Sequence, residues 1–154
     1  YSPYRLKIPS KTSLSFAYIF NMSGLISIDF STQNLSNSYF SQNDTSEYLN
    51  SVNTEVSKTL NPINTLKIGG EYRFKDISFR AGYYYQTKNQ DTNINEDQAV
   101  TLGIGFDFGA SNLSLSLIKF EKNKDFVLFA KGLNSPYQIK ENLTQITLSY
   151  NFKL

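Results

Sequence analysis

The side chains that could do chemistry in this sequence are charged residues within segments of alternating polarity. Six of them fall on the polar side of their segments: Asp29, Lys67, Glu71, Arg73, Arg80 and Asp107. In neighbouring antiparallel strands such residues lie at similar heights, and their signs allow cross-strand ion pairs. The pattern predicts a charged ladder on one face of a sheet. This ladder could pack against a plug or guide a carboxylate, or it could be a polar wall that holds strand register. Lys67 is expected higher on the same face, where it could meet an anionic head group.

Small residues share the polar side with the charges. They are Gly69, Gly82, Gly103 and Gly105. Glycine inside a strand marks a bend, a bulge or a close approach of another group. These positions therefore leave room for a plug or a ligand tail, or they serve the curvature of the sheet.

The composition excludes most catalytic chemistry. The 154 residues include no His and no Cys, so the commonest general base, the commonest zinc ligand and thiolate chemistry are all missing. A Ser–His hydrolase cannot be built without His, and no residues suggest a catalytic carboxylate pair. We expect no enzyme activity, no cofactor and no metal. The net charge of +2 gives no reason to expect nucleic acid as a partner.

One segment has part of a metal-binding pattern. The alternate positions of DTNINED at 91–97 carry oxygen ligands as in a calcium loop: Asp91, Asn93, Asn95 and Asp97. Glu96 stands where such a loop needs glycine, and Leu102 stands where it needs a bidentate glutamate. A solvated loop fits this segment better than a calcium site.

The elements that must position these side chains are segments in which apolar and polar residues alternate. We expect seven strands, at roughly 11–20, 25–34, 65–74, 77–86, 99–108, 113–121 and 142–154. This alternation is typical of strands whose two faces meet different media. Their length of about nine to eleven residues suits tilted strands that cross a bilayer.

The connections alternate between short and long. Tight turns are expected at 21–24, 75–76 and 109–112, and long polar loops at 37–64, 87–97 and 121–141. Transmembrane barrels have short periplasmic turns and longer loops outside. We therefore expect an all-β, antiparallel up-and-down transmembrane β-barrel, with residues 1–154 forming a single partial barrel domain. A soluble sandwich or a lipocalin-like barrel is the alternative.

Aromatic residues gather near the short turns. The residues expected in a periplasmic girdle are Tyr18, Phe20, Phe30, Tyr72, Phe74, Phe79, Phe106, Phe108, Tyr150 and Phe152. Such girdles mark a membrane interface. Tyr83, Tyr85 and Phe120 are candidates for the other interface.

The loop at 37–64 is expected to contain an amphipathic helix. Asp44 with Glu47 suits an N-terminal capping box, and Asn61–Pro62 would end the helix. Apolar residues follow at helical spacing: Leu49, Val52, Val56 and Leu60. This helix could capture hydrophobic ligands over the extracellular mouth of the barrel, or it could pack on the rim of the barrel.

The last segment, ITLSYNFKL, is amphipathic up to its final residue. Outer-membrane barrels commonly end in such a strand with a terminal aromatic residue, which the barrel assembly machinery reads. Here Phe152 is followed by Lys153 and Leu154, which departs from that habit. We expect the assembly machinery to be a partner of this strand.

Four segments in order carry a resemblance: FAYIFNMSGLISIDF, LKIGGEYRFKDISFRAGYYY, VTLGIGFDFGASNLSLSL and ITLSYNF. The chain resembles the C-terminal half of the FadL-type outer-membrane transporters, in the form found in Bacteroidetes-like bacteria. This resemblance implies a fourteen-stranded barrel, a plug formed by the N-terminal segment, and passage of long-chain fatty acids or other hydrophobic molecules. The seven strands would be the last seven. Single-chain barrels in bacteria have an even strand count, so the missing N-terminal half is an expected partner.

The expected function is that of an outer-membrane channel for passive uptake of hydrophobic compounds such as long-chain fatty acids. Its location would be the bacterial outer membrane, and its partners would be the lipid bilayer and a hydrophobic small-molecule ligand. The alternative is a non-transporting barrel that acts as a scaffold or secretion-system partner through its extracellular loops. A large apolar cavity would favour transport, whereas a lumen filled by side chains and salt bridges would favour the scaffold.

Overall fold

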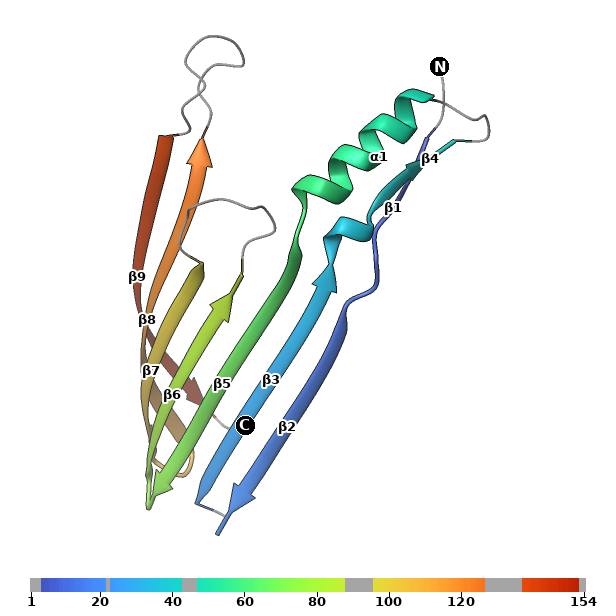
Figure 1. Ribbon diagram of the computed structural model, residues 1–154. Helices are drawn as coiled ribbons and strands as arrows, with labels where there is room; N and C mark the ends of the chain where they lie inside the picture. Colours follow the sequence, from blue (N-terminus) through green and yellow to red (C-terminus); the bar gives the residue numbers. More distant parts are fainter. Residues whose placement is uncertain (1–3, 22, 43–46, 88–95, 127–136, 153–154) are drawn as a thin grey trace.

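The computed structural model describes residues 4–21, 23–42, 47–87, 96–126 and 137–152, with the side chains of 123–126 and 137–138 left aside. These described residues fold into two β-sheets and one α-helix (Figure 1). The elements are β1 (Arg5–Lys7), β2 (Thr12–Phe20), β3 (Gly24–Asn34), a 3-10 turn (Leu35–Asn37), β4 (Tyr39–Ser41), α1 (Glu47–Thr59), β5 (Pro62–Phe74), β6 (Ile77–Gln86), β7 (Asp97–Asp107), β8 (Ser111–Phe126) and β9 (Tyr137–Phe152).

The main sheet is an antiparallel meander of seven strands, in the order β2-β3-β5-β6-β7-β8-β9. The prediction of seven antiparallel up-and-down strands is confirmed. The sheet is not closed into a barrel, because β2 and β9 are both edge strands of the described sheet. The strands alternate in direction, so the first and the seventh run the same way. They cannot form an antiparallel ladder with each other.

Short connections join β2 to β3, β5 to β6 and β7 to β8, all at one end of the sheet, which we call the tight-turn end (Figure 1). Each turn contains a residue in the left-handed region: Asn21 (φ 48°), Lys75 (φ 55°) and Gly109 (φ 82°). Hairpin turns need such positive φ values to match the twist of the strands that they join. The opposite end, where β3 leads toward α1, is the long-loop end.

The strand bounds differ from the expected ones mainly at the long-loop end. β8 and β9 have 16 residues each and pair as far as Phe126 and Tyr137. The long loop expected at 121–141 is therefore reduced to the segment between these two residues. This extension has few apolar residues, so it lacks the alternation by which a strand is predicted. Its ladder depends on backbone pairing, which the sequence pattern does not report.

A small layer covers the long-loop end of β3 and β5. β1 pairs with β4 in a separate two-stranded sheet, and α1 lies beside it (Figure 1). The backbone N–H of Phe40 donates to Asn53 Oδ1 (2.7 Å), and Asn53 Nδ2 donates to the Phe40 carbonyl (2.9 Å). These two hydrogen bonds join the helix to β4. β1 and β4 were not predicted, because three residues are too few for a periodic pattern.

The helix expected in the loop is confirmed as α1. Its half-buried side is formed by Leu49, Val52, Val56 and Asn53, and Leu60 directly follows the helix. The expected cap residue Asp44 lies outside the described residues. The structure thus places the apolar stripe of α1 against the small layer and leaves its other side exposed.

Candidate functional site

One face of the main sheet is apolar across all seven strands. The register aligns one such row from edge to edge: Tyr18, Ile26, Gly70, Ala81, Leu102, Leu117 and Ile146. Most large side chains on this face are exposed, up to 75% for Leu14 and 72% for Phe152. Among the described residues, Ala99 is the only buried apolar one, with 7% of its surface exposed. The described chain therefore has no conventional core on either side of the sheet.

The apolar band slants across the ladder. On β2 it runs from Leu14 to Phe20, and on β9 from Ile146 to Phe152. The register places Asn142 of β9, not Ile146, in the row of Leu14. The band thus shifts by four residues over the six steps between strands, about 14 Å along the strands for about 29 Å across them. The band has the same length on the two edge strands, so the strands lean by about 25° against a flat apolar layer that crosses both.

The aromatic residues divide between the two ends of this band. The following lie on the apolar face toward the tight-turn end: Tyr18, Phe20, Tyr72, Phe74, Phe79, Phe106, Phe108, Tyr150 and Phe152. Phe30 was expected with them, but it pairs with Leu14 and Leu66 near the long-loop end. It lies six residues beyond Gly24, about 20 Å along the strand. The register thus places Phe30 in the row of Tyr85 near the long-loop end, away from the other residues expected in the girdle.

The polar face carries one cluster from the predicted charged ladder. Arg80 lies directly opposite Glu71 in the register. Arg80 Nε donates to Glu71 Oε2 (2.8 Å), and Arg73 Nε donates to Glu71 Oε1 (2.6 Å). One carboxylate thus holds two guanidinium groups. Beside this cluster, a polar hollow of about 530 Å³ opens at the tight-turn end, lined by Arg73, Arg80, Lys75 and Asp107 among others.

The rest of the ladder does not form a chain of ion pairs. Asp29 and Lys67 are directly opposite each other, but the Asp29 carboxylate accepts a hydrogen bond from the Ser15 hydroxyl. Within the described part of the chain no ion pair joins Asp29 to Lys67. Asp107 Oδ1 accepts from the Gly109 N–H (2.9 Å) and so stabilises the β7–β8 turn. Among the described residues, the part of the ladder that forms a cluster is Glu71 with Arg73 and Arg80.

Glycines on the polar face give space to hydroxyl groups of the neighbouring strand. A Cβ at Gly82 would lie 2.6 Å from Thr101 Oγ1, and one at Gly105 would lie 2.5 Å from Ser78 Oγ. Arg80 lies next to Gly103: a Cβ added to Gly103 would be 3.5 Å from the Cβ of Arg80. The room that the sequence offered to a ligand tail is already occupied at these positions.

Near the long-loop end the polar face has an apolar patch that sequence reasoning missed. The rings of Tyr84 and Phe120 contact each other, with centroids 6.3 Å apart, and Ala99 lies between them in the register. Lys67 lies directly opposite Tyr84. Phe120 therefore belongs to the polar face and not to the second aromatic girdle. The sequence signal for this patch is the run Tyr83 to Tyr85, because its middle residue, Tyr84, is an aromatic residue at a position that faces the polar side.

Apolar side chains are also exposed in the small layer at the long-loop end. They are Tyr4, Leu6, Ile8, Tyr39 and Tyr48. They come from β1, β4, α1 and the chain around them. The long-loop end thus carries exposed apolar side chains in the small layer as well as the Tyr84–Phe120 patch on the main sheet.

Comparisons with family models, curated proteins and solved structures found no match to this chain. In the described segments, no helix combines the length and the apolarity needed to cross a membrane. No group of three metal-ligating acidic, His or Cys side chains occurs there either. Positions 91–95 of the calcium-like segment lie outside the described residues. The fold and the site define a mostly β protein, an antiparallel meander with one apolar and one polar face.

Proposed function

We propose that this chain is part of a transmembrane β-barrel of the bacterial outer membrane, which lets hydrophobic compounds such as long-chain fatty acids cross passively. The slanted apolar band carries the proposal. A flat slab of lipid crossed by leaning strands needs an apolar band of constant width that shifts steadily along the ladder. Aromatic side chains at the edges of the band match the position of an interface.

Strand length supports the same conclusion. β2 has nine residues and β7 has eleven, which is the length that tilted strands need to cross a bilayer. A soluble sandwich would have to bury the whole apolar face under a second sheet. The described chain offers no such sheet, since its remaining elements lie at the long-loop end (Figure 1).

Closing the barrel needs further strands. The unpaired edges of β2 and β9 would cost several kcal/mol for each unsatisfied backbone group within lipid. Because β2 and β9 run in the same direction, only an odd number of additional strands closes an entirely antiparallel barrel. Seven more would complete fourteen strands. A second copy in the same orientation would bring β9 against β2 as parallel neighbours, so a complementary half fits better than a copy.

Passive transport requires an apolar path and a mouth that concentrates the ligand. The Tyr84–Phe120 patch lies on the polar face, which would be the lumen, and toward the long-loop end. Lys67 beside it would meet a carboxylate head group. The exposed apolar side chains of β1, β4 and α1 would extend this surface toward the outside.

A non-transporting scaffold is the second candidate, and a specific observation favours it. The Glu71 cluster and the hydroxyl groups packed over Gly82 and Gly105 fill part of the polar face near the tight-turn end. A lumen filled in this way along its whole length would block passage. The loops would then be the functional part, as binding sites for other proteins.

Uptake of radiolabelled oleate by proteoliposomes that contain the full-length protein tests the proposal. We expect uptake above that of empty vesicles, and a reduction by Phe120→Ala and by Lys67→Gln. The matched control is Phe16→Ala, which removes the same ring from the apolar face. Membrane insertion without uptake would favour the scaffold. A protein that remains in solution and does not insert would overturn the barrel itself.

A further inference from the structure

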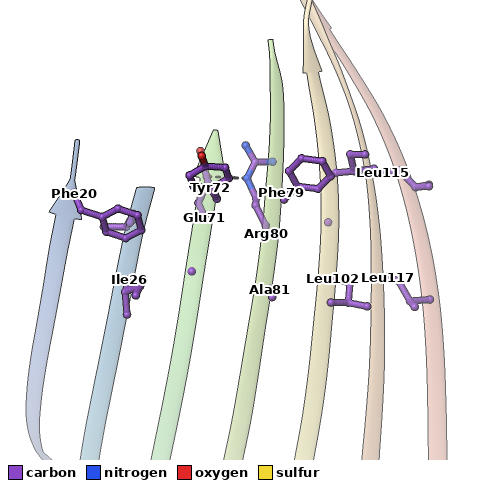
Figure 2. A pocket seen from close by; sticks show the side chains of 14 residues that line it. Phe20, Ile26, Glu71, Tyr72, Phe79, Arg80, Ala81, Leu102, Leu115 and Leu117 are labelled. Carbon is purple, nitrogen blue, oxygen red and sulfur yellow. Dashed lines mark hydrogen bonds and ion pairs between the residues drawn. The ribbon is translucent and has the colours of Figure 1, made fainter. Parts of the chain in front are cut away.

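The apolar face contains a hollow in the β5–β6 hairpin. Gly70 and Ala81 lie directly opposite each other and form its floor. Figure 2 shows Phe20, Tyr72, Phe79 and Leu115 in one row across the sheet, and Ile26, Ala81, Leu102 and Leu117 in the next. The hollow has a volume of about 610 Å³. Its walls are aromatic and aliphatic side chains of the apolar band.

Backbone packing does not require a glycine at position 70. A Cβ there would meet the Leu25 carbonyl at 3.4 Å and Ile26 Cγ1 at 4.0 Å, which are ordinary contacts. Gly82, by contrast, lies against a hydroxyl group. Glycine inside a strand lowers stability relative to residues with side chains. The packing of the sheet therefore does not explain why position 70 is glycine, whereas the hollow does, since a larger side chain at this position would fill it.

A cation lies where the same hairpin turns. Lys75 Nζ is 5.6 Å from the centroid of the Phe74 ring, which belongs to the apolar face. Five residues separate Gly70 from Lys75, about 17 Å along the strand. The hairpin thus offers an apolar hollow within the band and a positive charge at the band's border. An amphiphile with a negative head group has this same arrangement.

We propose that the hollow binds one acyl chain of an anionic phospholipid from the leaflet on the tight-turn side, with its phosphate near Lys75. This inference rests on the proposed function, because it needs the apolar face to meet lipid. A juxtamembrane Lys contributes an attraction to anionic lipid that corresponds to about a fivefold preference. Asp76, in the same turn, opposes that attraction.

Native mass spectrometry of the full-length protein tests the proposal, after exchange into mixed micelles with equal phosphatidylglycerol and phosphatidylcholine. We expect one retained phosphatidylglycerol, favoured about fivefold over phosphatidylcholine. Gly70→Leu and Ala81→Leu should abolish retention, whereas the control Ala110→Leu, which adds the same bulk in the β7–β8 turn, should not. Lys75→Gln should remove the preference for phosphatidylglycerol, and Asp76→Asn should increase it.

The proposal would be overturned by unchanged lipid retention in the two hollow variants, or by flotation of the protein without retained lipid. Unchanged retention in Gly70→Leu and Ala81→Leu would place the lipid elsewhere on the band. Loss of a higher-mass assembly in these variants, with lipid retention unchanged, would make the hollow a contact between proteins. Flotation of the same proteins with vesicles separates this inference from the proposed function. Flotation without retained lipid rejects the site alone, and failure to float rejects both.

Discussion

Glu71 and Arg80 lie directly opposite each other on β5 and β6, and Arg80 Nε donates to Glu71 Oε2 at 2.8 Å. Arg73, two residues further along β5, donates to the other oxygen of the same carboxylate. A single carboxylate therefore pairs with two arginines on the polar face, and the cluster keeps one net positive charge. The arrangement ties two neighbouring strands together at the height of the apolar hollow, which lies on the opposite face.

Replacing Glu71 by Gln should destabilise the protein modestly. The variant loses both charge-assisted hydrogen bonds and leaves two guanidinium groups close together. Because the Arg73 and Arg80 side chains are 64% and 47% exposed, solvent weakens these interactions, and we expect a cost of about 0.5–1 kcal/mol. Urea unfolding in detergent measures it. Lys67→Gln removes a charge that forms no ion pair within the described residues, so it should cost less. An equal cost for both variants would contradict the role of the cluster.

Gly82→Ala should destabilise the main sheet by about 1–2 kcal/mol, because the new Cβ meets Thr101 Oγ1. Thr101→Ala removes that oxygen, so the double variant should recover most of the loss. Thermal unfolding of the four proteins provides the double-mutant cycle. Gly70→Ala is the matched control on the other face of the sheet and should not destabilise it, because a Cβ there makes only ordinary contacts. Additive losses for Gly82→Ala and Thr101→Ala would show that the two residues do not interact.

A charged residue introduced within the apolar band should reduce the free energy of unfolding in lipid far more than one introduced beyond the band. Leu102→Arg places a guanidinium in the middle of the band on β7, where lipid would impose a penalty of about 2–4 kcal/mol. Thr144→Arg lies on the same face but outside the band on β9, and should cost less than about 1 kcal/mol. Folding into vesicles, followed by urea titration, compares the two variants. Similar costs would mean that no lipid layer covers the band.

The pairing of β7, β8 and β9 beyond the band should weaken in acid. Gln98 Nε2 donates to Glu121 Oε2 (3.1 Å). This hydrogen bond, with Lys140 and Lys119 nearby, lowers the pKa of Glu121 below its usual value. A carboxyl group whose pKa is lower in the folded than in the unfolded protein stabilises the fold at any pH above its pKa in the unfolded protein. This contribution is lost as the pH falls through the pKa of Glu121 in the folded protein. We expect amide protection factors around Gln98 and Glu121 to fall over that range.

Glu121→Gln should remove this pH dependence, because Gln does not titrate. The control is Glu55→Gln, which removes a carboxylate on α1, away from Gln98 and Glu121. Hydrogen exchange with correction for the intrinsic rate measures protection in all three proteins. A pH response that persists in Glu121→Gln would assign the effect to another group.

Much of the fold could be predicted from the sequence because its signals are local. Alternation of period two defines each strand and its greasy side without knowledge of any partner strand. The tight turn at Lys75 and Asp76, the helix from Glu47 to Thr59 and the absence of His and Cys chemistry follow in the same way. The candidate site was predicted less well. Of the six charges in the ladder, Glu71, Arg73 and Arg80 are joined, since ion pairing depends on which residues of different strands are opposite.

The sequence by itself determined which residues share a face, because neighbouring side chains of a strand point to opposite sides. Only the tertiary structure decided the heights of those residues relative to other strands. Register put Phe30 at the long-loop end, paired Tyr84 with Phe120, and brought Gly70 opposite Ala81. Register also made the apolar band slant. Register is set by hydrogen bonds between strands. A shift of two residues keeps every side chain on the same face, so the alternation within one strand does not distinguish these registers.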